Sequence, residues 1–146
     1  MKIEIRKAKP EDFKTVYLLI KEFAEFIRTS EKVLITPEQM EMDKDFFNCF
    51  IAVDNDKIIG FATYFTAYYS WTGKALYLDD LYVLEQYRGQ GIGNSLFDKI
   101  IETAKNDRCK KVKWQVSKWN QKAIDFYKGK GAVIDEVEIN CELMIV

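Results

Sequence analysis

The chain has 146 residues, of which 48% are hydrophobic and 31% are charged, the composition of a globular domain with one core. Its 22 basic and 23 acidic side chains nearly cancel, so no overall field would attract nucleic acid or a membrane surface. The sequence contains no histidine, which excludes Ser-His-Asp and Cys-His nucleophiles and most zinc sites. Any catalytic acid or base must come from Asp, Glu, Tyr, Lys or Cys.

Neither a membrane span nor a secretion signal is predicted. No apolar run reaches the roughly 18 residues of a span, and the opening MKIEIRKAKPEDF lacks the apolar region of a signal peptide, so we expect a cytoplasmic protein. Cys49, Cys109 and Cys141 are odd in number and widely spaced, which favours buried or incidental thiols over disulfides or a metal site. Without repeats, linkers or low-complexity tracts, residues 1–146 are expected to form one domain.

The N-terminal part of the chain is predicted to form a strand and two helices. Ile3 and Ile5 alternate with polar residues, which indicates a short strand before Pro10. Apolar residues then recur at helical spacing and predict a long amphipathic helix: Phe13, Val16, Tyr17, Ile20, Phe23, Ala24 and Ile27. Thr36 and Pro37 provide an N-cap and a first-turn proline for a second helix.

Three strands are expected next, and the third contains an irregularity. Residues 49–53 and 58–69 form a predicted hairpin, followed by a strand over residues 75–84. In this third strand the apolar residues change from even to odd positions, at Leu76, Leu78, Leu81 and Val83. Asp79 and Asp80 stand at the change, which predicts a β-bulge that aims acidic groups.

Residues 87–97, YRGQGIGNSLF, place three alternating glycines directly before a predicted helix. A glycine-rich approach lets an anion reach the free N–H groups of a helix N-terminus, and Arg88 adds a cation, so a phosphate site is predicted. A Walker loop is excluded because no Lys-Ser or Lys-Thr follows at the required place. The dinucleotide fingerprint fails because Asn94 stands where its third glycine belongs.

The remaining chain is predicted to continue with a strand over residues 112–116, parallel to the strand before the glycine loop because a helix connects the two. Asn120 is expected to cap a short helix that ends at Gly129 or Gly131. Two closing strands are predicted near residues 132–138 and 141–146.

The spacing Arg88-x-x-Gly91-x-Gly93, between a bulged strand and a helix, resembles the pyrophosphate motif of the GNAT family of acetyl-CoA-dependent N-acetyltransferases, and the resemblance runs nearly end to end. More narrowly, the chain is similar to the diamine branch, which includes spermidine/spermine N1-acetyltransferase and thialysine N-acetyltransferases. The matching stretches are IIGFATYF, WTGKALYLDDLYV, YRGQGIG, WN and FYKGKGA. The branch usually has Glu-Asp where this chain has Asp79-Asp80, and the segment after Ala132 matches poorly.

The resemblance implies an α/β fold with a mixed, mostly antiparallel sheet, flanked by helices and splayed between two parallel strands at the cofactor site. Acetyl-CoA would be the donor cosubstrate, without a metal. Its pantetheine arm would pair with the backbone of Leu81, Tyr82 and Val83. Its pyrophosphate and remaining atoms would contact Arg88, Gly89, Gln90, Gly91, Ile92, Gly93, Asn94, Asn120 and Tyr127.

The acceptor implied by the resemblance is the primary amine of a diamine, polyamine or thialysine-like compound. The resemblance also implies that this amine attacks acetyl-CoA directly in a ternary complex, and that the chain forms a homodimer. Tyr127 matches the general acid, and Asp79, acting through water, is the candidate base. Asp80 would pair with the cationic acceptor, and Trp71 would form a wall of its site.

Each assignment has a structural alternative. The glycines could serve only as turns, Tyr127 as a core residue, Trp71 as a loop anchor, and the two aspartates as solvated groups at a strand end. The lysines and Arg108 of residues 105–113 could be plain surface or contact the adenosine 3′-phosphate. Two other functions stay open: acetylation of a protein or peptide amine, and a catalytically silent CoA-binding regulator.

Overall fold

The computed structural model of the protein describes residues 2–145, and the chain divides into two compact units, one ending at Gln115 and one beginning at Val116. Each unit is described by itself, and the single domain remains a prediction. The helices and strands of the first unit are β1 (Ile3–Lys7), α1 (Phe13–Phe26), α2 (Pro37–Met42), β2 (Asn48–Asp54), β3 (Lys57–Tyr69), β4 (Gly73–Val83), α3 (Ile92–Asn106) and β5 (Lys111–Lys113). The second unit contains α4 (Gln121–Gly129).

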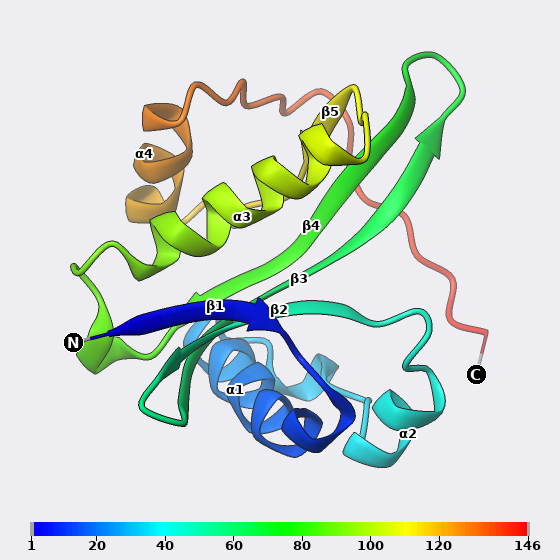
Figure 1. The fold of residues 1–146 in the computed structure, drawn as a ribbon. Helices are drawn as coiled ribbons and strands as arrows, with labels where there is room; N and C mark the ends of the chain where they lie inside the picture. Colours follow the sequence, from blue (N-terminus) through cyan, green and yellow to red (C-terminus); the bar gives the residue numbers. More distant parts are fainter. Residues whose placement is uncertain (1, 146) are drawn as a thin grey trace. The chain divides into compact units, whose positions relative to one another are not determined.

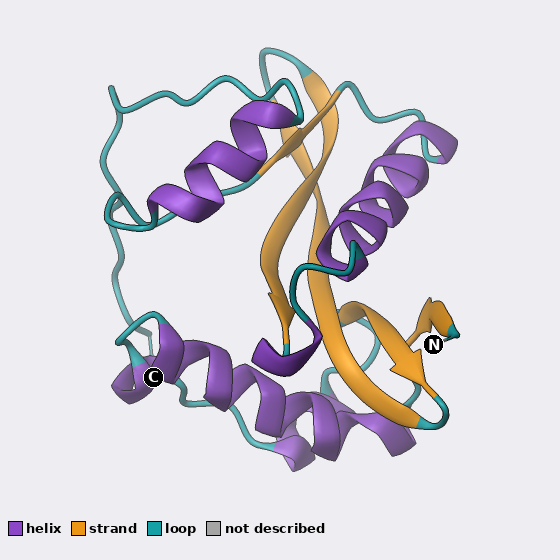
Figure 2. Cartoon of the chain, turned by 90° about the vertical axis from the view of Figure 1, so that its left-hand side faces the viewer, coloured by secondary structure: helices purple, strands orange, loops and turns teal. Residues whose placement is uncertain are grey.

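The first unit is built on a five-stranded sheet in the order β1-β2-β3-β4-β5. Neighbouring strands from β1 to β4 are antiparallel, whereas β4 and β5 are parallel, as predicted for strands joined by a helix. Figure 1 shows α3 on one side of the sheet and α1 with α2 on the other. The long β3–β4 hairpin is twisted along its length (Figure 2). This arrangement confirms the expected mixed α/β sheet.

The core of this unit lies between the sheet and the helices on its two faces. Val16 on α1 and Leu96 and Ile100 on α3 are fully buried, because the apolar stripes predicted for these helices face the strands. The strands contribute Ile51, Ile59, Phe61, Leu76 and Leu78. No helix among residues 2–145 is long and apolar enough to cross a membrane.

The predicted bulge is present in β4. Thr63 of β3 pairs with Asp80, and Tyr64 pairs with Leu78, so Asp79 is the extra residue between two ladder partners. An extra residue reverses the alternation of side chains beyond it, which explains the change of phase in the apolar pattern.

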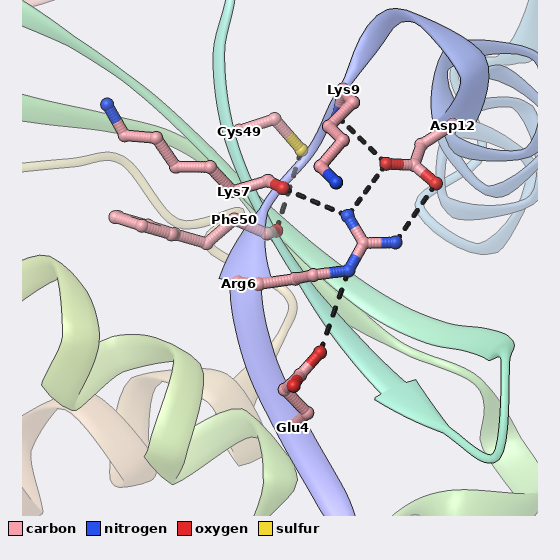
Figure 3. A network of polar contacts seen from close by, with 7 residues as sticks. All are labelled: Glu4, Arg6, Lys7, Lys9, Asp12, Cys49 and Phe50. Atoms are coloured by element: carbon pink, nitrogen blue, oxygen red, sulfur yellow. Dashed lines mark hydrogen bonds and ion pairs between the residues drawn. The ribbon is translucent and has the colours of Figure 1, made fainter.

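A polar network fixes the connection from β1 to α1 (Figure 3). The Arg6 guanidinium donates to both carboxylate oxygens of Asp12, at 2.9 and 3.2 Å, and the Lys9 backbone N–H donates to Asp12 at 2.8 Å. The Arg6 hydrogen bond, together with the backbone donor and the positive charges nearby, lowers the pKa of Asp12 despite its burial. This ion pair holds the start of α1 at the end of the edge strand β1.

The C-terminal strands predicted near residues 132–138 and 141–146 are wrong, because residues 132–145 form no strand; residue 146 lies outside the described part. Val137, Ile139 and Leu143 have the expected alternation, but each is at least 85% exposed. Alternation marks a segment able to form a strand, while a stable strand also needs neighbours to accept its hydrogen bonds. The strand predicted over residues 112–116 is likewise shorter and ends at Lys113.

Gly60→Ala is expected to lower the free energy of unfolding by about 1–3 kcal/mol. An added Cβ would lie 2.9 Å from the carbonyl oxygen of Tyr82 and 3.3 Å from a methyl group of Val83, so β3 and β4 would have to move apart. Chemical denaturation measures the change. Gly93→Ala is the matched control, because its Cβ would meet only a Val83 methyl group, at an ordinary 3.8 Å. Equal unfolding free energies for the two variants would contradict this account of the packing.

Candidate active site

The loop before α3 has the backbone conformation that its glycines suggested. Gly89 and Gly91 have φ angles of 80° and 81°, which favour glycine, although an added Cβ would meet nothing within 4 Å at either position. Gly91 is the N-cap residue of α3 and offers no side-chain acceptor to the N–H groups of the first turn. Gly89, Gln90, Gly91 and Asn94 are exposed, whereas the Ile92 side chain is buried in the core. The loop therefore presents a helix N-terminus suited to an anion.

Gly93 differs from the two glycines before it. It lies in the first turn of α3 without a positive φ, and a Cβ there would make only ordinary contact with Val83. Alanine also has a higher helix propensity than glycine by about 1 kcal/mol. Neither the backbone conformation nor the packing therefore requires glycine at position 93.

The end of β4 next to this loop has an open edge. β5 pairs with β4 only from Ala75 to Tyr77 and ends at Lys113, whereas β4 continues to Val83, so the second half of β4 extends beyond its parallel partner. The Leu84 N–H donates to the Ile59 carbonyl of β3. Since backbone groups alternate along a strand, those of Tyr82 face β3, and those of Leu81 and Val83 face the opposite edge. The expected parallel pair of strands, β4 and β5, is present.

Arg88 lies at the junction of the open edge and the glycine loop. Its Nε donates to the Val83 carbonyl at 2.9 Å. Its guanidinium carbon lies 4.8 Å from the centre of the Phe26 ring and 5.3 Å from that of Tyr82. The structure thus places the predicted phosphate-binding cation against aromatic rings of α1 and β4.

A cavity of about 360 Å³ lies between the helices α1 and α2 and the strands β2, β3 and β4. Both predicted aspartates, Asp79 and Asp80, line it, together with Asp43 at the C-terminus of α2. Successive residues of a regular strand point to opposite faces, and the bulge is what allows these two neighbours to reach the same cavity. The other lining residues are largely apolar or aromatic: Ile20, Ile35, Met40, Phe46, Phe47, Asn48, Thr63, Tyr64 and Phe65.

The two aspartates interact as like charges in a partly desolvated place. Burial, and secondarily the charge of Asp79, raises the pKa of Asp80 to about 7. Burial also raises the pKa of Asp79, although its side chain is in contact with solvent. The proton that the two groups retain belongs to the pair, since the ionisation of either carboxyl disfavours that of the other. At neutral pH the cavity therefore contains a carboxylate pair able to bind a cation and to accept a proton.

The structure does not bring Trp71 to this cavity. Trp71 lies in the turn between β3 and β4 and is 97% exposed. Sequence reasoning did not select the aromatic lining either, because Phe65 lies on β3, far along the chain from Phe46 and Phe47. The adjacent aromatic pair Phe46-Phe47, between α2 and β2, was the available sequence signal, and in the structure Phe46 is 83% exposed while lining the cavity.

The other two predicted site residues lie in the second unit. Asn120 is the N-cap of α4, and its side-chain oxygen accepts from the Ala123 N–H at 3.2 Å, which confirms the predicted cap. Tyr127 lies on α4, is partly exposed, and has the neighbouring Phe126 ring 5.3 Å away, centre to centre. The helix ends at Gly129, one of the two expected positions.

Comparison with known proteins identifies the family. Residues 13–132 match the Acetyltransferase (GNAT) family. Over 140 residues the chain is 36% identical to thialysine N-epsilon-acetyltransferase from Mus musculus, with 88% of this chain and 82% of that protein covered. It is 34% identical over 141 residues to spermidine/spermine N(1)-acetyltransferase-like protein 1 from Homo sapiens, with 89% of this chain and 20% of that protein covered.

Solved structures agree on the fold. An aminoglycoside acetyltransferase from an uncultured soil metagenomic sample, in complex with sisomicin, has a TM-score of 0.80 at 20% identity and covers 99% of this chain and 97% of its own. A possible acetyltransferase from Clostridium difficile 630 has a TM-score of 0.80 at 21% identity, with both chains fully covered. These comparisons show that the chain belongs to the GNAT family and is an N-acetyltransferase. The acetyl donor of this family is acetyl-CoA.

Proposed function

We propose that the chain transfers the acetyl group of acetyl-CoA to a primary amine of a small cationic acceptor, a diamine, polyamine or thialysine-like compound. The observation that carries this proposal is the cavity lined by Asp43, Asp79 and Asp80. Acidic groups and aromatic faces both attract ammonium groups. Relatives named for thialysine and for spermidine/spermine acetylation support the same acceptor class.

The donor site that we propose is the open end of β4 together with the glycine loop. The backbone groups of Leu81 and the Val83 N–H, which face away from β3, can pair with the amide groups of the pantetheine arm, while the Val83 carbonyl is bonded to Arg88. The N-terminus of α3, approached through Gly89, Gly91 and Gly93, suits the pyrophosphate. These residues fit acetyl-CoA because the strand edge offers backbone groups to its extended, peptide-like arm, and the N-terminus of α3 offers N–H groups to its anionic pyrophosphate. Asn120 is kept as a further cofactor contact, a role implied by the family resemblance.

The chemistry requires the acceptor nitrogen to lose two protons and the departing thiolate to gain one. The acceptor amine attacks the thioester carbonyl as a free base, so its ammonium form must first lose a proton. We assign this proton to Asp79, through water, because Asp79 is the bulged residue and is open to solvent. Asp80 then pairs with the charged acceptor. When the C–S bond breaks, the attacking nitrogen releases its second proton to solvent, and the thiolate of CoA takes a proton from the Tyr127 hydroxyl, which solvent then restores. The role of Tyr127 is the one implied by the resemblance.

The mixed acidic and aromatic lining of the cavity suits an acceptor in which a methylene chain joins two amine groups. A methylene chain would pack against Phe46, Phe47 and Phe65, and we assign its second cationic group to Asp43. The carboxylate of Asp43 is oriented by the Gln39 side-chain amide, which donates to it at 3.0 Å. An uncharged monoamine would lack the second attraction.

We also propose that the protein works as a homodimer, as its resemblance implies. The exposed apolar side chains of Val137, Ile139 and Leu143 support a partner surface on the second unit, since large exposed apolar patches mark interaction sites.

Gly93→Ala is expected to weaken acetyl-CoA binding at least about tenfold, because a methyl group in the first turn of α3 would obstruct an anion at the helix N-terminus. Isothermal titration calorimetry with CoA measures the affinity, and thermal unfolding verifies that the variant is folded. Gly91→Ala is the contrasting variant, since the positive φ of Gly91 predicts a loss of stability as well. Unchanged affinity in folded Gly93→Ala would make the loop purely structural.

The aspartates are tested by rates measured against pH with putrescine, spermidine and thialysine as acceptors. In the wild type kcat/KM should rise as the pair loses its shared proton, around pH 7. Asp79→Asn should lower kcat and flatten this rise. Asp80→Asn should mainly raise the acceptor KM, and salt should mimic part of that loss. Asp45→Asn, at an exposed position outside the cavity, is the control.

Two results would remove the diamine proposal while leaving the N-acetyltransferase assignment. One is a wild-type enzyme that acetylates none of the three acceptors. The other is that both aspartate variants treat charged and uncharged amines alike. Peptides and aminoglycosides, included in the same screen, would then identify the acceptor class.

Tyr127→Phe is expected to reduce kcat by roughly a hundredfold or more, with little change in acetyl-CoA affinity, because the ring remains and only the proton is lost. Steady-state kinetics and calorimetry separate the two quantities. Tyr68→Phe, at an 81% exposed tyrosine of the first unit, is the matched control. Wild-type turnover in Tyr127→Phe would eliminate this tyrosine as the acid.

A further inference from the structure

A chain of contacts links helix α1 to the open edge of β4. The Tyr82 hydroxyl donates to a carboxylate oxygen of Glu22 at 2.7 Å. The Tyr82 ring is buried, with only 6% exposed, and stacks on Phe23 with ring centres 5.2 Å apart and an interplanar angle of 28°. Glu22 and Phe23 are consecutive on α1, so this helix holds both the ring and the hydroxyl of Tyr82.

Arg88 continues this chain of contacts to the backbone. Its guanidinium carbon lies 4.8 Å from the ring centre of Phe26 and 5.3 Å from that of Tyr82, and its Nε donates to the Val83 carbonyl. Two aromatic faces and a carbonyl leave the guanidinium little rotational freedom. We call Glu22, Tyr82 and Arg88 the relay.

We propose that the relay positions the acetyl-CoA site: by holding the Val83 carbonyl, Glu22, Tyr82 and Arg88 orient the open edge of β4 for the pantetheine arm. They are positioning residues, since none is required to touch the reacting atoms. The inference rests on the proposed donor site. It gives Arg88 a different task from the phosphate contact expected from its place before the glycines.

The geometry explains why this edge needs a restraint. Beyond Tyr77, β5 no longer pairs with β4, so among the described residues no ladder on that side fixes the peptide planes of residues 81–83. The loop that follows contains two glycines with positive φ. With the Val83 carbonyl occupied by Arg88, the backbone groups of Leu81 and the Val83 N–H remain to pair with the ligand in one register.

The protonation state of the relay suits a permanent restraint. Burial, followed by the hydrogen bond to Glu22, raises the pKa of Tyr82 to about 12, against an opposing effect of Arg88. The hydroxyl therefore keeps its proton, and keeps donating to Glu22, across the physiological pH range.

The test compares two acetyl donors, acetyl-CoA and S-acetylpantetheine, which lacks the nucleotide and its phosphates. Tyr82→Phe and Glu22→Ala should each raise the KM of both donors by the same factor, about three- to tenfold, the size of one ordinary intramolecular hydrogen bond. The acceptor KM and kcat should stay within about twofold of wild type. Because the three groups act in series, the double variant should lose little more than either single variant.

Glu25→Ala is the matched control, since Glu25 is exposed one turn along the same helix and should leave both donor KM values unchanged. Thermal unfolding is measured for every variant. Glu22 is exposed, so Glu22→Ala tests the relay even if Tyr82→Phe fails to fold.

Three outcomes would overturn the inference: unchanged KM values in folded variants, losses that are simply additive, or a loss seen with acetyl-CoA alone. The last would mean that the relay serves the phosphates and leaves the strand edge unaffected. Failure of the relay is distinct from failure of the donor site, since CoA affinity would still fall in Gly93→Ala if only the relay were wrong.

Discussion

Asp79 has no ladder partner in β3, because Thr63 pairs with Asp80 and Tyr64 pairs with Leu78. This single extra residue separates β4 into two halves with different tasks. Before it, β4 is a central strand with β3 and β5 on its two sides. After it, β3 is the neighbouring strand among the described residues, the side chains have changed faces, and the edge away from β3 leads to the glycine loop. The acidic cavity follows from this irregularity, and the donor edge that we propose lies beyond it.

Bringing two carboxyl groups into one partly buried cavity has a thermodynamic cost. In the unfolded chain Asp80 would lose its proton near its ordinary pKa of 3.8, whereas in the folded protein it retains the proton to about pH 7. Between these values the unfolded state binds fewer protons, so Asp80 makes folding less favourable as the pH rises, and its contribution is constant above this window. A destabilising pKa shift of this kind is typical of catalytic sites, whose chemistry needs a group with a shifted pKa even at a cost in stability.

The sequence predicted those features that local chemistry determines. The caps at Thr36 and Asn120 follow from side chains that bond their own helices, and the bulge follows from a phase change within one strand. What it could not predict depends on distant partners. The place of Arg88 is set by Phe26 and Tyr82, and the link from Tyr82 to Glu22 spans 60 residues. The same limit explains the missing C-terminal strands, since alternation in residues 137–145 does not supply a neighbouring strand.

Gly60, Gly91 and Gly93 are under different structural constraints, so natural selection would retain them for different reasons. Gly60 is confined by the Tyr82 carbonyl and Gly91 by a positive φ, so a population selected only for folded protein would retain both. Gly93 meets neither constraint, and such a population would drift to alanine there as readily as to any helix-favouring residue. Among descendants of this chain, the residue at position 93 would therefore record whether the ancestral ligand was still in use.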